Sequence, residues 1–156
     1  MAHTNYLQSI FDKGFRNKSI NYVLKVLENI EYDAIAFSGM SGALMASIIA
    51  DRTGSGLIMV RKEMDVSHST LFIESSSHRK HTCKYVVIDD VISTGKTIKR
   101  IIWQVGSNSD LAYKSEMECV GIVLYGAAGL FLSSPPRFID IGYKVPIYCR
   151  KFINNS

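Results

Sequence analysis

Two adjacent carboxylates, followed closely by small and hydroxyl residues, are the part of this sequence best suited to chemistry. An apolar stretch at 86–88 leads into Asp89 and Asp90, and the turn 93–97 (Ser-Thr-Gly-Lys-Thr) follows. Apolar residues at 98, 101, 102 and 105 then recur with a helical period. The pattern predicts a strand that delivers two acids to its C-terminal end. A loop follows whose backbone N–H groups and helix N-terminus can hold a phosphate. Carboxylates that bind hydroxyl groups beside a phosphate site favour a sugar phosphate as the ligand.

The end of this segment, residues 94–97, also matches the close of a nucleotide-triphosphate-binding loop. Such a loop requires a glycine five residues before its Gly-Lys pair, and this chain has Asp90 there. A carboxylate at that position would repel a β-phosphate, which argues against this alternative. A plain strand-to-helix turn is a second alternative, since Asp, Ser and Thr commonly cap helices. A cap, however, needs only one acid.

The segment 86–98 as a whole resembles the motif with which type I phosphoribosyltransferases bind 5-phosphoribosyl-1-pyrophosphate (PRPP). The similarity lies in the apolar lead, the acidic pair and the Thr-Gly turn. It implies that Asp89 and Asp90 are the catalytic acids and engage the ribose 2- and 3-hydroxyls. It also implies that five residues bind the 5-phosphate of PRPP: Ser93, Thr94, Gly95, Lys96 and Thr97.

A second glycine-containing segment lies one strand and helix earlier and consists of Ser38, Gly39, Met40, Ser41 and Gly42. Alone it predicts only a turn between a strand at 34–37 and a helix at 43–51. Beside the PRPP-type motif, the resemblance implies a pyrophosphate-binding loop. Several family members carry a basic residue in this loop, and here the central residue is Met40. Backbone amides and magnesium would then neutralise more of the charge.

Arg61 and Lys62 follow the next apolar run, 57–60. Two basic residues at a strand end are as a rule simply solvated. Similar residues in orotate and adenine phosphoribosyltransferases meet phosphate, and a guanidinium suits bidentate phosphate contacts. The resemblance therefore implies that Arg61 and Lys62 also bind pyrophosphate.

Apolar runs at 34–37, 57–60, 70–74, 85–89 and 118–125 read as strands, and helical patterns separate several of them. This alternation predicts an α/β fold with a mostly parallel central sheet flanked by helices. Ligands of such sheets bind beyond the carboxyl ends of the strands, where both candidate loops fall. Ser19 is the expected N-cap of a packing helix that precedes the first strand, and the helix from Lys96 is expected to end at Gly106.

At 156 residues the chain is expected to form one domain. The resemblance covers about residues 33–125, the expected core. It implies that the terminal segments, 1–30 and 127–156, build a small hood that binds a base, with Phe131, Phe138 or Tyr143 available for stacking.

The polar segment 63–84 occupies the place of a mobile loop in the family. Its residues 78–81 (His-Arg-Lys-His) fit a solvated hairpin equally well. His68 is a weak candidate for an acid/base or phosphate contact.

Composition fits a globular cytoplasmic protein, with 47% hydrophobic and 21% charged residues and a net charge of +4. Cys83, Cys119 and Cys149 are odd in number and lack metal-ligand spacing, which predicts reduced thiols. The N-terminus has no signal-peptide pattern, and the longest apolar run is shorter than the roughly 20 residues that span a bilayer. We therefore expect no membrane contact.

The leading hypothesis is an enzyme, a PRPP-dependent phosphoribosyltransferase (a pentosyltransferase) that transfers the 5-phosphoribosyl group to a nucleobase and releases pyrophosphate. The Asp-Asp pair favours the orotate or adenine branch, whereas the short chain and the Thr-Gly-Lys-Thr turn resemble 6-oxopurine enzymes. The resemblance also implies Mg²⁺, held through PRPP oxygens without direct protein ligands, and a homodimer. A non-catalytic regulator that binds nucleic acid or a nucleotide is the alternative, and a non-base acceptor is a third reading.

Overall fold

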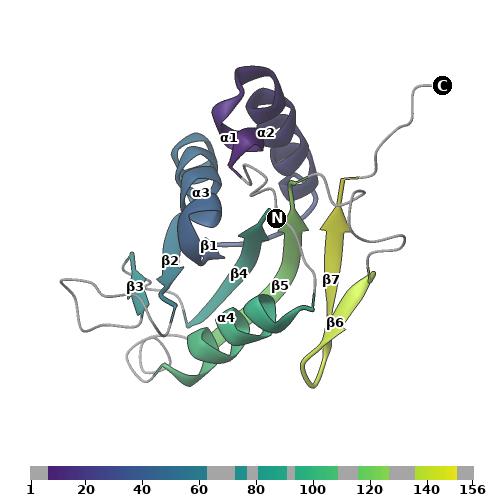
Figure 1. Cartoon of the computed structure of the whole chain (residues 1–156). Coiled ribbons are helices and arrows are strands. Elements are labelled where there is room, and N and C mark those ends of the chain that lie inside the picture. Colours follow the sequence, from purple (N-terminus) through teal and green to yellow (C-terminus); the bar gives the residue numbers. More distant parts are fainter. Residues whose placement is uncertain are drawn as a thin grey trace.

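The structure, a computed structural model, describes residues 7–62, 73–76, 81–90, 94–108, 116–126 and 136–150 (Figure 1). These residues form a seven-stranded sheet in the order β3-β2-β1-β4-β5-β7-β6. The strands are β1 (Ala34–Phe37), β2 (Gly56–Val60), β3 (Ile73–Ser75), β4 (Thr82–Asp89), β5 (Glu116–Leu124), β6 (Phe138–Asp140) and β7 (Lys144–Cys149). The helices are α1 (Gln8–Phe11), α2 (Lys13–Leu27), α3 (Gly39–Thr53) and α4 (Lys96–Ser107).

The sheet is mostly parallel, as the alternation of strands and helices predicted. Strands β2, β1, β4, β5 and β7 run parallel, while β3 and β6 pair antiparallel at the two edges. The chain moves from β1 to β2 on one side and returns to place β4 on the other side of β1. The strand order therefore reverses between β1 and β4, and open α/β sheets bind ligands at such a point.

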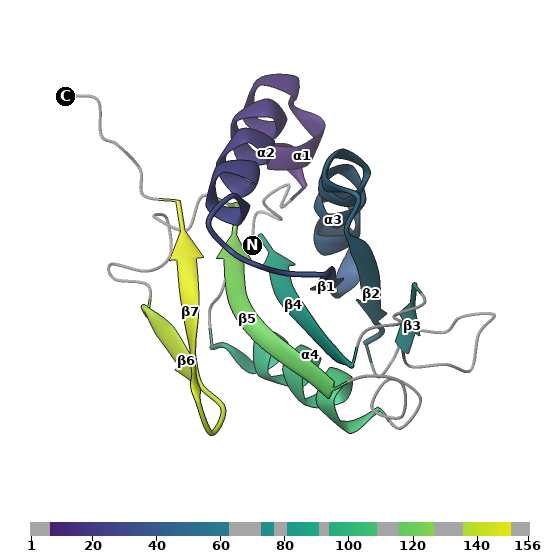
Figure 2. The same ribbon diagram turned by 180° about the vertical axis from the view of Figure 1, so that it is seen from behind.

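Helices cover both faces of the sheet, with α2 and α3 on one face and α4 on the other (Figures 1 and 2). Alternate strand residues explain the two layers, since side chains point to opposite faces in turn. Ile35 and Phe37 of β1 pack with α2 and α3, whereas Ala34 and Ala36 belong to the α4 layer. The apolar α4 residues predicted from the helical period are all buried in that layer: Ile98, Ile101, Ile102 and Val105.

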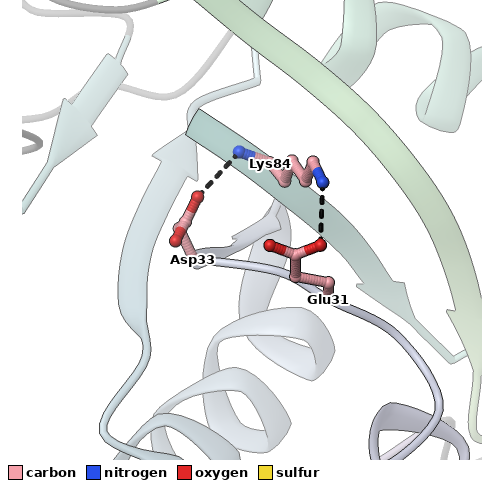
Figure 3. Close-up of polar contacts among 3 residues, drawn as sticks. All are labelled: Glu31, Asp33 and Lys84. Atoms are coloured by element: carbon pink, nitrogen blue, oxygen red, sulfur yellow. Dashed lines mark hydrogen bonds and ion pairs between the residues drawn. The ribbon is translucent and has the colours of Figure 1, made fainter. Parts of the chain in front are cut away.

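The amino ends of β1 and β4 are held together by Asp33 and Lys84 (Figure 3). The Asp33 amide donates to the Lys84 carbonyl (2.7 Å), and the Lys84 amide donates to Asp33 Oδ2 (3.0 Å). Lys84 Nζ forms an ion pair with the exposed Glu31 (3.0 Å), which raises the pKa of Lys84. These contacts help to fix a register that pairs Ala36 with Val87. Continued by two residues, the register aligns Ser38 with Asp89 at the opposite end of the strands.

Three helix boundaries differ from the sequence-based expectations. Helix α2 begins at Lys13 rather than at Ser19, because the Asp12 carboxylate accepts a hydrogen bond from the Phe15 amide (2.9 Å) and caps it. Ser19 is instead buried within the helix. Helix α3 begins at Gly39, so most of the expected loop 38–42 is its first turn. Helix α4 continues through Gly106 to Ser107.

The C-terminal segment adds two strands to the sheet, since β7 pairs with β5 and forms a hairpin with β6. The hood expected from segments 1–30 and 127–156 stays a prediction. Within the described residues, no helix is long and apolar enough to cross a membrane.

Candidate active site

The two acids lie at the carboxyl end of β4, beside the point where the strand order reverses. Asp89 is buried, with 8% of its surface exposed, and its Oδ1 accepts a hydrogen bond from the Asp90 amide (2.9 Å). Asp90 is partly exposed. The end of β5 secures the backbone of this pair, because the Tyr125 amide donates to the Asp89 carbonyl (3.1 Å) and the Gly126 amide to the Asp90 carbonyl (2.7 Å).

Burial is the main cause that raises the pKa of Asp89 from 3.8 to about 7, and the neighbouring charge of Asp90 is the second cause. The hydrogen bond from the Asp90 amide and the positive charge of Lys62 act in the opposite direction. Desolvation disfavours the charged form of a carboxyl group, and a like charge nearby does the same. The result is a carboxyl group whose charge changes near neutral pH.

The N-terminus of α4 lies just beyond the acids in the chain. Gly95 precedes the helix with φ +75°, and its carbonyl accepts from the Lys99 amide (3.0 Å). Thr94, Lys96 and Thr97 are exposed around this end. Exposed helix N-termini attract anions through their free N–H groups. The geometry suits the predicted phosphate contact for these four residues, while Ser93 lies outside the described residues.

The N-terminus of α3 forms the other side of the candidate site. Its Ser38 N-cap is buried and makes no side-chain cap contact with the helix. Gly39 has φ +74°, which favours glycine, and a Cβ placed on it would lie 3.4 Å from Cε of Lys62. The Lys62 side chain therefore lies beside the start of α3. Because its charge also acts on Asp89, Lys62 links the ends of β2, β1 and β4.

The first turn of α3 packs tightly against two strands. A Cβ on Gly42 would lie 3.0 Å from Cβ of Phe37 and 3.4 Å from the Ile88 carbonyl oxygen. The buried Tyr125 hydroxyl donates to the Ser41 carbonyl (2.9 Å). Burial, followed by the charges of Asp90 and Asp89, raises the Tyr125 pKa well above its ordinary value, so the phenol stays a donor. Only Met40 of the turn points strongly outward, with 59% of its surface exposed.

Arg61 pairs with the Glu74 carboxylate of β3. This ion pair joins the end of β2 to the sheet edge, and the predicted phosphate contact of Arg61 remains a prediction. His68, the loop residues 63–72 and 77–80, and Phe131 also lie outside the described residues. Tyr143 accepts a hydrogen bond from the Cys119 amide (3.2 Å), and the exposed Phe138 ring is covered by Lys144 Nζ at 4.6 Å.

Sequence reasoning missed two residues that hold this site together, Arg100 and Tyr125. Arg100 of α4 donates from Nη2 to Ser38 Oγ (3.0 Å). Its position one turn into an amphipathic helix predicts a solvated side chain, and no local pattern indicates a contact 62 residues earlier. Tyr125 follows an apolar strand and looks like an ordinary core residue. Both contacts are products of the tertiary fold.

Comparison with known proteins identifies related enzymes, although no family model matches the chain. Adenine phosphoribosyltransferase of Mycoplasma capricolum subsp. capricolum is 30% identical over 115 residues. The match covers 66% of this chain and 64% of that enzyme, so the chain spans slightly less than two thirds of its relative.

Solved structures of phosphoribosyltransferases share the fold. Adenine phosphoribosyltransferase from Saccharomyces cerevisiae, in complex with an imino-altritol bisphosphate and adenine, superposes with a TM-score of 0.61 at 16% identity. That alignment covers 92% of this chain and 82% of the other. Orotate phosphoribosyltransferase from Mycobacterium tuberculosis, in complex with PRPP, superposes with a TM-score of 0.55 at 17% identity. That alignment covers 79% of this chain and 66% of the other. This chain is therefore similar in sequence to an adenine phosphoribosyltransferase and shares the fold of the type I phosphoribosyltransferases.

Proposed function

We propose that this protein transfers the 5-phosphoribosyl group of PRPP to a nucleobase of the adenine or orotate type. The observation that carries the proposal is the meeting of three features where the strand order reverses. An acidic pair ends β4, a helix N-terminus rich in hydroxyls follows it, and a second helix N-terminus begins beside it at Ser38. The relatives named above, an adenine enzyme and an orotate enzyme, support the choice of acceptor.

Each part of the site has a role in this reaction. Residues 94–97, with Ser93, bind the 5-phosphate, and Asp89 and Asp90 accept hydrogen bonds from the ribose hydroxyls. The start of α3, together with Lys62 and Arg61, binds the pyrophosphate. A bond forms between a nitrogen of the base and the anomeric carbon, while the bond from that carbon to the pyrophosphate oxygen breaks, and the proton of that nitrogen passes to solvent or to pyrophosphate. Its electron pair leaves with pyrophosphate, so fixed positive charge and backbone N–H groups there favour the transition state.

Magnesium is expected to accompany the donor. The described residues contain no group of three or more His, Cys, Asp or Glu side chains that would cage a metal ion. Mg²⁺ commonly keeps several waters and binds through substrate phosphates, so we expect PRPP oxygens to hold the ion without direct protein ligands. When bound, the ion would neutralise charge on the departing pyrophosphate. A homodimer and a cytoplasmic location are further expectations from the family resemblance.

The test is product formation from PRPP and Mg²⁺ with a panel of adenine, orotate, hypoxanthine, guanine, xanthine and uracil. Chromatography with mass detection would identify the nucleoside monophosphate, and a coupled assay would follow pyrophosphate. We expect one base, adenine or orotate, to give equal amounts of both products. If no base gave product while calorimetry still showed PRPP binding, catalysis on a nucleobase would be contradicted. That result would favour a regulator or a non-base acceptor.

A further inference from the structure

Arg100 is a cation of the candidate site that neither the family motif nor the chain's local pattern indicates. Its side chain extends from α4 to Ser38, where Nη2 donates a hydrogen bond to Oγ (3.0 Å). This contact uses one of the five N–H groups of the guanidinium. Its Nε is buried and has no hydrogen-bond partner among the described residues. No carboxylate in the described part of the chain forms an ion pair with it. The guanidinium is therefore partly buried with its charge uncompensated by this part of the protein.

The fold places the Arg100 guanidinium at the edge of the sheet that carries the candidate site. Ser38 continues the side of β1 that carries Ala34 and Ala36, so its side chain faces the α4 layer. Asp89 is on the same side of β4, in line with Tyr85 and Val87. The register aligns Ser38 with Asp89, as described above. Arg100 thus brings positive charge to the beginning of α3, at the edge of the sheet where ligands bind.

A partly buried charge is costly unless an opposite charge or several hydrogen bonds compensate it. Guanidinium groups match phosphate oxygens with parallel hydrogen bonds. The turn that begins at Ser38 has no basic residue of its own, and its outward side chain is the apolar Met40. A cation supplied from α4 would provide the positive charge that this turn lacks.

We propose that Arg100 binds the pyrophosphate group of the donor and of the product, acting from α4 in place of a basic residue in the 38–42 turn. The inference rests on the proposed function and adds to it a binding residue that the motif does not contain. Arg100 contacts the leaving group with the N–H groups that Ser38 does not occupy. Its effect is confined to the pyrophosphate end of the site, because the 5-phosphate end is formed by the first turn of α4 at 94–97.

The test is calorimetric titration of pyrophosphate with Mg²⁺, and separately of ribose 5-phosphate, into wild type and Arg100→Met. Hydrogen bonds to a charged group typically contribute enough to predict a roughly 10- to 100-fold weaker pyrophosphate affinity in the variant. Affinity for ribose 5-phosphate is expected to change by less than about twofold. Lys99→Met is the matched control, since Lys99 is the exposed neighbour on the same helix, and it should change neither affinity.

Arg100→Lys keeps the charge and the aliphatic stem and provides a second variant if Arg100→Met fails to fold. It should bind pyrophosphate more weakly than wild type, because an ammonium cannot make the parallel contacts. Unchanged pyrophosphate affinity in the folded variants would overturn the proposal, and so would equal losses for both ligands. A wild-type protein that binds ribose 5-phosphate but not pyrophosphate would overturn this inference alone. Binding of neither ligand, nor of PRPP, would overturn the proposed function as well.

Discussion

At the scale of single residues, the proposed reaction depends on two neighbouring acids in different environments. Asp89 is buried and carries a raised pKa, whereas Asp90 is partly exposed at the end of the same strand. Asp89 Oδ1 already accepts the Asp90 amide. The second oxygen of Asp89 and the carboxylate of Asp90 are the groups that we assign to the ribose hydroxyls.

Replacing either acid by asparagine should impair transfer without unfolding the protein. A neutral amide accepts hydrogen bonds more weakly than a carboxylate, so each single variant should lower kcat/KM by roughly 10- to 100-fold. The double variant should be nearly inactive. Steady-state assays with the best base would measure this, and Asp51→Asn at the exposed far end of α3 is the matched control. Full activity in both single variants would show that the acids are not catalytic.

The raised pKa of Asp89 makes a separate prediction about stability. In the unfolded chain this carboxyl group ionises near pH 3.8, whereas in the folded protein it stays protonated up to about pH 7. The folded state therefore binds more protons between these values, and its stability falls as the pH rises through that window. The Asp89→Asn variant has no ionisable side chain at this position, so its stability lacks this contribution.

The test is denaturant unfolding of wild type and Asp89→Asn from pH 4 to 8. The free energy of unfolding of wild type, minus that of the variant, should decrease from about pH 4 to about pH 7 and then level off. A difference that rises with pH would mean that the folded protein favours the charged carboxylate.

The two acids show what a sequence can predict at this scale. Their place at the end of a strand follows from local order: apolar residues, two acids, a turn and a helix. The roles of Arg100 and Tyr125 depend on contacts with residues 62 and 84 positions away. Neither side chain carries a local signal, because the same residue types in the same patterns usually serve as solvated or core residues.

At the scale of elements, the start of α3 is the part that the sequence described least well. Glycines and serines predicted a loop at 38–42, yet Gly39–Thr53 is continuous helix. The reason is packing rather than propensity. Gly42 lets the helix approach Phe37 and Ile88 closely, and the Tyr125 hydroxyl binds the Ser41 carbonyl. Tertiary contacts thus stabilise a helical turn that local preference disfavours.

A methyl group at Gly42 should disturb this packing. Its Cβ would lie 3.0 Å from Cβ of Phe37, tighter than most Cβ contacts, so Phe37 or the start of α3 would have to shift by a few tenths of an ångström. We expect Gly42→Ala to lower the free energy of unfolding by about 1–3 kcal/mol, as measured by denaturant titration. Activity should fall too, since we propose that this turn binds the pyrophosphate of the donor.

Gly106→Ala in α4 is the matched control for this substitution. A Cβ there meets no atom within 4 Å, and the residue is helical and exposed. This variant should be as stable as wild type or more stable by up to about 1 kcal/mol. If Gly42→Ala behaved in the same way, the first turn of α3 would not pack as closely as the structure indicates.

At the scale of the whole molecule, the fold brings two separate helix N-termini to one edge of a parallel sheet. The sequence predicted a mostly parallel sheet with helices on both faces, because periodicity and strand–helix alternation are local properties. The strand order was not predictable in the same way. Reversal between β1 and β4 places Ser38 level with Asp89, and it depends on pairings such as Asp33 with Lys84 across 51 residues.

The most direct test of the central claim is hydrogen exchange, followed by mass spectrometry, with and without PRPP and Mg²⁺. If the donor binds where the strand order reverses, exchange should slow at both helix starts, in peptides covering 39–42 and 94–98. Peptides from the β6–β7 hairpin, 138–149, should exchange at unchanged rates. Protection of both helix starts would support the site described here. Binding of PRPP that leaves both unprotected, or that protects only segments elsewhere, would contradict it.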